Sequence, residues 1–220
     1  MAQIKKTTLG FLNELKYNNH RDWFQSHQDE YKEAKKNFES FVQELLNEIV
    51  AFDPDLKGLE VKNSVFRINR DIRFSNDKSP YKTNFGAFMV RGGKKNGDKF
   101  AGYYFHVEPA GCMIAGGAYV PPSPWLNAIR EKISDEPEEF LRIINDKDFK
   151  KYFGTIDGEK LKTAPKGYPS DHPQIEYLKM KSFLAMTNVS DNKALEPGYL
   201  QYVVKCFRAM KPLNDFLNTF

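Results

Sequence analysis

The stretch "KFAGYYFHVEPAGCMIAGGAYV", residues 99–120, decides the fold. It predicts two strands, over 99–108 and 112–120, joined by the turn "PAG". The preceding stretch 81–90, "YKTNFGAFMV", places alternate side chains on opposite sides and predicts a strand before them. Strands that follow one another in this way pair as an antiparallel meander.

A further strand is predicted just upstream, where the period is again two. Phe66, Ile68, Ile72 and Phe74 share one face of this segment. Strict alternation places Arg70 on the same face, where a charge is costly unless it is paired. Two outcomes follow: Arg70 finds a carboxylate or a ligand, or a bulge near Arg70 and Asp71 turns it outward.

Helices flank the strand block on both sides. Apolar residues spaced by three and four from Trp23 to Ile49 predict one long amphipathic helix over about 20–50, capped by Asn18 or Asn19. Thr8 caps a shorter helix before it. Ser123 caps the first of the later helices, with Pro124 as its first residue.

The C-terminal half predicts mostly helices and little sheet. Helices are expected over 125–133, 136–145, 147–153, 174–179 and 198–217, a strand over 182–189, and a small hairpin over 155–163 on an Asp157-Gly158 turn. Because strands and helices are segregated along the chain, the fold class is α+β. We expect a central antiparallel meander sheet, with the long N-terminal helix and the C-terminal helices packed against it, in a single domain over 1–220.

Composition narrows the class of protein. Of the 220 residues 40% are hydrophobic and 14% aromatic, which argues against disorder. No apolar run has the length of a membrane span or of a signal-peptide core. The two cysteines, Cys112 and Cys206, are far apart and in no metal or redox spacing. Free thiols without an export signal predict a cytoplasmic protein that does not enter a membrane.

Positive charge is concentrated in one part of the chain. Ten basic and three acidic side chains lie within residues 62–99, which gives this segment a net charge of +7, against +4 for the whole chain. A local positive field favours an anionic ligand over general adhesion to acidic surfaces.

The centre of this segment carries a motif. "RINRDIRFSNDKSPY", residues 67–81, matches R-x-x-R-D-x-R-F-x-x-x-K-x-P-Y throughout. In this respect the chain resembles a family of bacterial and fungal proteins known only as a domain of unknown function. The stretches "NNHRDWF" (18–24) and "PKGYPSDHP" (165–173) are similar to that family too. The resemblance implies membership but no activity, cofactor or ligand.

The motif residues define the predicted binding site. Arginine forks onto phosphate or carboxylate with two hydrogen bonds, a neighbouring carboxylate orients it, and a lysine in a turn adds a point charge. The candidate ligand-binding residues are Arg67, Arg70, Asp71, Arg73, Lys78 and Tyr81. On a straight strand Arg67 and Arg73 would lie ~20 Å apart, so a compact site needs a bend or partners from other strands. An internal Arg–Asp network that pins the turn to the sheet explains the same residues.

His106 is the one candidate for a catalytic residue. It shares a strand face with Tyr104 and Glu108, so Glu108 could orient it as a general acid or base. A hydrogen-bonded structural histidine fits the same pattern. No metal-ligand spacing, nucleotide-binding loop or hydrolase motif is present.

Three functions remain open from the sequence. The first is a site for a phosphate- or carboxylate-bearing small molecule, in an enzyme or a sensor. The second is a nucleic-acid-binding module that uses the basic segment 62–99. The third is a structural Arg–Asp network without a ligand. The anionic small molecule is the preferred hypothesis, because nucleic-acid-binding domains often have a more strongly basic surface. Reaction type, cofactor and oligomeric state are not predicted.

Overall fold

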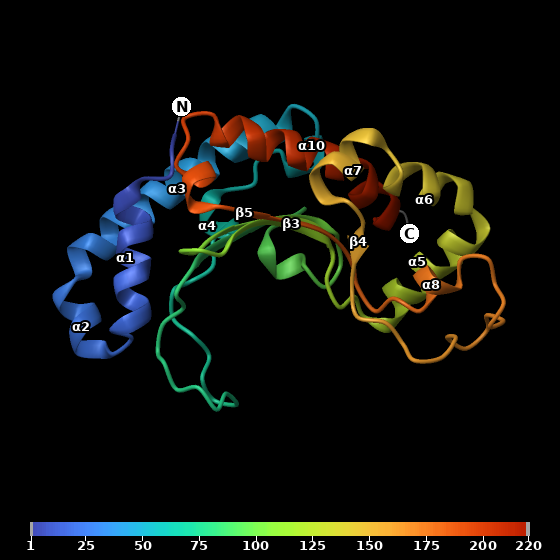
Figure 1. Ribbon diagram of the computed structural model, residues 1–220, viewed down its shortest axis with the longest axis horizontal. Helices are drawn as coiled ribbons and strands as arrows, with labels where there is room; N and C mark the ends of the chain where they lie inside the picture. Colours follow the sequence, from blue (N-terminus) through green and yellow to red (C-terminus); the bar gives the residue numbers. More distant parts are fainter. Residues whose placement is uncertain (1, 219–220) are drawn as a thin grey trace.

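A five-stranded antiparallel sheet organises the computed structural model, which describes residues 2–218 (Figure 1). The strand order is β1-β2-β3-β5-β4. The strands are β1 (Phe85–Met89), β2 (Gly102–Val107), β3 (Cys112–Ala118), β4 (Ile156–Asp157) and β5 (Phe183–Val189). Strands β1, β2 and β3 form the predicted meander, so the α+β class with a central antiparallel sheet is confirmed.

Two long helices cover one face of the sheet. Figure 1 shows α3 (Gln28–Val50) and α10 (Tyr199–Leu217) side by side above it. The core lies in this layer: the fully buried Phe105 of β2 stacks on Phe41 of α3, with 4.9 Å between ring centroids. Alternation along β2 turns Tyr103, Phe105 and Val107 towards the helices.

Shorter helices pack around the two ends of the sheet. They are α1 (Lys6–Tyr17), α2 (Arg21–Ser26), α4 (Val61–Ser64), α5 (Ser123–Asp135), α6 (Pro137–Ile144), α7 (Lys147–Phe153), α8 (Ile175–Leu178) and α9 (Asp191–Ala194), with 3-10 turns η1 (Pro54–Leu56) and η2 (Lys94–Asn96). The predicted helices after residue 120 are all present. None of the helices in residues 2–218 is long and apolar enough to cross a bilayer.

The N-terminal helices depart from the prediction at their starts. The helix expected over 20–50 is divided at His27, whose φ of −112° and ψ of 27° separate α2 from α3. The cap of α2 is His20, whose Nδ1 accepts from the Trp23 amide, and not Asn18 or Asn19.

Two hydroxyl side chains that were predicted to cap helices lie inside them instead. Thr8 lies inside α1, which begins after Lys5, and its hydroxyl donates to Asn37 at 2.7 Å. The buried position of Thr8 gives it this long-range partner in place of its own helix end. In α5 the cap is Pro122, and Ser123 is already helical.

The strand predicted over 66–74 is also wrong. Only isolated bridges form there, from Val65 to Ala87 and from Asn69 to Tyr81. Between these bridges the five residues 82–86 lie opposite only the three residues 66–68. The two extra residues in the second segment interrupt the ladder of hydrogen bonds. Beyond Arg70 the chain leaves the sheet, and Phe74, expected among apolar neighbours, is 95% exposed.

The hairpin predicted over 155–163 does not form. Residues 156–157 are the edge strand β4, which pairs antiparallel with β5. A Cβ at Gly158 would collide with the carbonyl oxygen of Ser182, so the glycine permits a close approach to the chain before β5 and does not make a turn.

Candidate functional site

The motif residues lie in an irregular loop, residues 65–84, which we call the motif loop. In Figure 1 it descends from β1 on the side of the sheet opposite α3 and α10. That open face carries the alternate side chains of β2, Tyr104 and His106, both only partly buried. The motif loop and the open face of the sheet therefore border each other.

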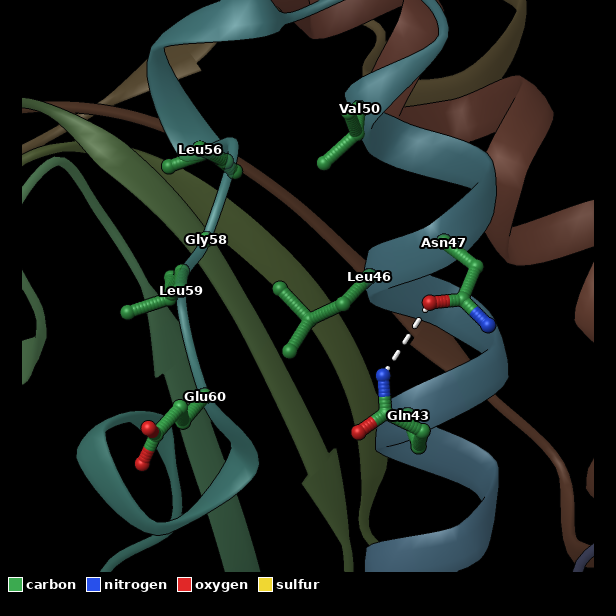
Figure 2. A pocket seen from close by; sticks show the side chains of 8 residues that line it. All are labelled: Gln43, Leu46, Asn47, Val50, Leu56, Gly58, Leu59 and Glu60. Atoms are coloured by element: carbon green, nitrogen blue, oxygen red, sulfur yellow. Dashed lines mark hydrogen bonds between the residues drawn. The ribbon is translucent and has the colours of Figure 1, made fainter.

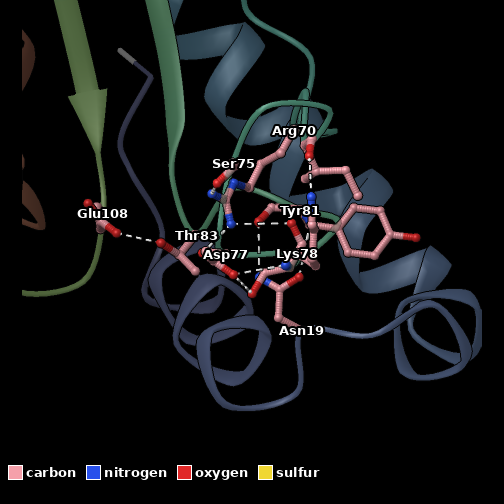
Figure 3. A network of polar contacts seen from close by, with 10 residues as sticks. Asn19, Arg70, Ser75, Asp77, Lys78, Tyr81, Thr83 and Glu108 are labelled. Carbon is pink, nitrogen blue, oxygen red and sulfur yellow. Dashed lines mark hydrogen bonds and ion pairs between the residues drawn. The ribbon is translucent and has the colours of Figure 1, made fainter.

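Arg70 ties the loop together from within. Its guanidinium forms an ion pair with Asp77 and donates to the Ser79 carbonyl (3.3 Å) and the Ser75 hydroxyl (3.4 Å) (Figure 3). Its amide donates to the Pro80 carbonyl at 2.9 Å. Of the two outcomes expected for Arg70, the structure contains the first, because the guanidinium meets a carboxylate.

Hydrogen bonds within its own turn hold the Asp77 carboxylate in position for this ion pair. Its Oδ1 accepts from the amide of Ser79 (2.9 Å) and from the hydroxyl (2.7 Å). These hydrogen bonds, and then Arg70, lower the pKa of Asp77 to about 2. Asp77 was not among the predicted site residues, although Asp-x-Ser before a proline is a signal for this kind of turn.

A second ion pair lies further out on the loop. Arg73 donates from Nε and from a terminal nitrogen to the two oxygens of Asp71, at 2.9 and 2.7 Å. Asp71 thus orients one guanidinium, and Arg73 lowers its pKa. Lys78 donates to the Ile72 carbonyl at 3.1 Å. The interactions of all three side chains are within the loop.

Tyr81 anchors the loop to the N-terminal helices. Its ring is buried and stacks on Phe24 of α2, with centroids 3.9 Å apart. The Asn19 side chain accepts from the Tyr81 amide (3.1 Å) and donates to its carbonyl (3.0 Å) (Figure 3). This contact explains why Asn19 is not a helix cap.

Arg67 has a different environment from the other two arginines. It is exposed, and its charge acts on Lys82, whose pKa is lowered first by burial and then by Arg67. The Lys82 ammonium lies over the Phe66 ring, 5.2 Å from the centroid. Within residues 2–218 neither cationic side chain forms an ion pair or a hydrogen bond.

His106 belongs to a hydrogen-bonded chain on the open face. Its Nδ1 lies 2.9 Å from the Tyr104 hydroxyl, and its Nε2 lies 3.1 Å from Glu108 Oε2. Glu108 Oε1 accepts from the Thr83 hydroxyl at 2.6 Å, which links the chain to the motif loop (Figure 3). Burial, and then Glu108, raise the pKa of Tyr104 to about 12, so the phenol stays protonated.

Gly86 leaves room for this arrangement. A Cβ at Gly86 would lie 2.9 Å from the Tyr104 hydroxyl oxygen, closer than side-chain carbons approach. The Phe66 ring lies 6.4 Å from the Tyr104 ring. Contacts therefore run from Lys82 through Phe66 and Tyr104 to His106.

Two cavities lie away from the motif loop. The larger, of about 490 Å³, separates α3 from residues 56–60 and is lined by leucines, Val50 and uncharged amides, with Glu60 at its rim (Figure 2). It holds no cation. The smaller, of about 330 Å³, has three aspartates and one arginine in its lining. Neither suits an anion, and neither contains a predicted site residue.

The fold and the site together define an α+β protein with an arginine-rich loop beside an open sheet face. A family of conserved hypothetical proteins, DUF2461, matches residues 7–216, and the chain belongs to this family. This match agrees with the resemblance to a family of unknown function. That the motif over residues 67–81 is characteristic of the family stays a prediction. Comparison with curated proteins finds no match, and comparison with solved structures finds none either.

Proposed function

We propose that this protein binds a small phosphate- or carboxylate-bearing molecule where the motif loop meets the open face of the sheet. The observation that carries the proposal is the position of Lys82, whose ammonium lies over the ring of Phe66, the chain neighbour of Arg67. Within residues 2–218 neither Lys82 nor Arg67 forms an ion pair, although Asp71 is close enough to feel the charge of Arg67. Like charges that are close and partly desolvated raise each other's energy. An anion between them would remove this cost and accept the fork of the arginine.

The other motif residues would shape this site. Arg70 and Tyr81 hold the loop on its own turn and on α2. Asp71 keeps Arg73 in one orientation, and Lys78 stays exposed, so both cations can add to the positive field at the ligand. We keep His106, oriented by Glu108, as the proposed acid or base, because it borders the same position.

A nucleic acid is the second candidate ligand, on a separate observation. Phe74 is almost fully exposed at the outer part of the loop, with the Arg73 guanidinium 5.7 Å from its ring centroid. An exposed ring beside cations is the arrangement on which single-stranded bases stack. For either ligand the buried free thiols Cys112 and Cys206 support the cytoplasm as the proposed location.

The test is calorimetric titration at low salt with inorganic phosphate and pyrophosphate. The variant Lys82→Met keeps the aliphatic stem and removes the charge. Lys95→Met is the matched control, because Lys95 is exposed in the same basic segment and both variants change the net charge equally. We expect affinity to fall at least tenfold in Lys82→Met and to stay within twofold in Lys95→Met.

A further variant, Phe74→Ala, separates the two ligands. Binding of an oligothymidylate that falls steeply with salt, and that Phe74→Ala weakens, would favour the nucleic-acid function. Equal losses of phosphate affinity in Lys82→Met and Lys95→Met would contradict a defined anion site, since they would show only the effect of net charge.

A further inference from the structure

Glu108 is a carboxylate placed at the edge of the proposed anion site. It follows β2 directly, and its side chain is 30% exposed. One oxygen accepts from Thr83 and the other from His106, at 2.6 and 3.1 Å. A carboxylate has about four acceptor positions, so about two remain for other donors.

His106 orients one oxygen of this carboxylate, with its Nε2 3.1 Å from Glu108 Oε2. The Asn84 amide nitrogen, 3.3 Å from His106 Nδ1, can only donate, and the Tyr104 hydroxyl lies 2.9 Å from the same nitrogen. Nδ1 is therefore an acceptor, and the ring proton is on Nε2, where it is donated to Glu108. Through this hydrogen bond the imidazole holds Glu108 in place.

A chain of neighbouring side chains connects Lys82 to Glu108. Thr83, which donates to Glu108, directly follows Lys82, whose ammonium lies over Phe66. The Phe66 ring in turn contacts Tyr104, the hydrogen-bond partner of His106. A ligand held at Lys82 therefore has a carboxylate acceptor on the same surface.

We infer that the ligand has two unlike ends: an anionic group held by Arg67 and Lys82, and a hydroxyl or ammonium donor that Glu108 accepts. This inference rests on the proposed function and names its ligand class, a phosphorylated or carboxylated alcohol or amine. Glu108 is the residue that determines specificity, because its charge attracts a donor and repels a second anionic group. Polyphosphates and dicarboxylates are excluded by that repulsion.

The experiment compares four probes by calorimetry at low salt: inorganic phosphate, pyrophosphate, glycerol 3-phosphate and phosphoethanolamine. With the unmodified protein we expect glycerol 3-phosphate, phosphoethanolamine or both to bind at least tenfold more tightly than phosphate, and pyrophosphate to gain nothing. Phosphoethanolamine alone would identify an ammonium as the donor, and glycerol 3-phosphate alone a hydroxyl.

Glu108→Gln is the diagnostic variant, since it keeps the shape and the contact with Thr83. It should reduce the advantage of the donor-bearing probes to within threefold of phosphate and leave phosphate affinity unchanged or improved. Glu33→Gln, an exposed change on α3, is the matched control and should alter none of the affinities.

The failures of the two proposals are distinguishable. Phosphate binding that depends on Lys82, with equal affinity for all four probes or with pyrophosphate the tightest, would overturn the inference and leave the anion site standing. An equal loss for every probe in Glu108→Gln, with a lower melting temperature, would show a structural role and overturn it too. Absence of binding by any probe would refute both.

Discussion

The buried pair of Tyr103 and Asp53 gives the sharpest test of the core. Tyr103 is 1% exposed, and its hydroxyl donates to Asp53 Oδ2 at 2.7 Å. Within residues 2–218 the other Asp53 oxygen forms an ion pair with Lys211, at 3.9 Å. The variant Tyr103→Phe removes the one short hydrogen bond to this carboxylate from the protein core and keeps the volume of the ring.

The expected loss follows from the charge of the acceptor. A hydrogen bond to a charged group contributes about 1.5–3 kcal/mol, more than a neutral one. We therefore expect Tyr103→Phe to lower the free energy of unfolding by about 2 kcal/mol. With an m-value of about 2 kcal/mol/M, the urea midpoint should fall by about 1 M.

Tyr199 offers a matched control for this substitution. It is as deeply buried, yet its hydroxyl has no hydrogen-bond partner within residues 2–218. Removing a buried polar group that makes no hydrogen bond costs nothing and relieves a desolvation penalty. Tyr199→Phe should leave stability unchanged or raise it by about 1 kcal/mol.

Urea unfolding followed by circular dichroism measures both variants. We expect Tyr103→Phe and Tyr199→Phe to shift the urea midpoint in opposite directions or by clearly unequal amounts, at an unchanged m-value. If Tyr199→Phe loses as much stability as Tyr103→Phe, the individual hydrogen bond is not what decides the cost.

Two further predictions concern the motif loop. Arg70→Ala should speed chymotrypsin cleavage after the exposed Phe74 several-fold, because it releases three loop contacts, whereas Arg73→Ala should change the rate little; equal rates would contradict the bracing role of Arg70. Because the pKa of Asp77 is lowered from its usual 3.8 to about 2, its contribution is complete above about pH 4 and is lost as the pH falls towards 2. The amide signal of Ser79 in NMR spectra should follow this titration, and a midpoint near 4 would exclude the lowered pKa.

Local patterns were sufficient to predict most of the fold. Strands 99–108 and 112–120 alternate in the sequence and turn at "PAG", and the structure forms β2 and β3 there. The motif loop does not form the predicted strand, and the reason is non-local. The bridge at Val65 and the bridge at Asn69 have different registers with the partner segment, so no continuous ladder forms between them. Likewise, Asp157-Gly158 is an ordinary turn signal, and the close approach to Ser182 is decided by a distant segment.

The candidate site was predictable in its position more than in its contacts. Alternation predicted that Arg70 needs a partner. That the partner is Asp77 follows only from the folded conformation of the loop. His106 and Glu108 were correctly paired, because two residues on one strand face have neighbouring side chains. Lys82 was not among the predicted site residues, because its proposed role depends on the Phe66 ring and the Arg67 charge, which act on it only in the folded chain.

Because side chains alternate along β2, this one strand contributes both to the core and to the open face of the sheet. Odd-numbered positions such as Phe105 fill the interior, and even-numbered ones such as His106 face outward. Substitutions at the even positions can therefore change the open face while the core stays as it is. An insertion of one residue would exchange the two sets, so that the core and the hydrogen-bonded chain of the open face would be lost together.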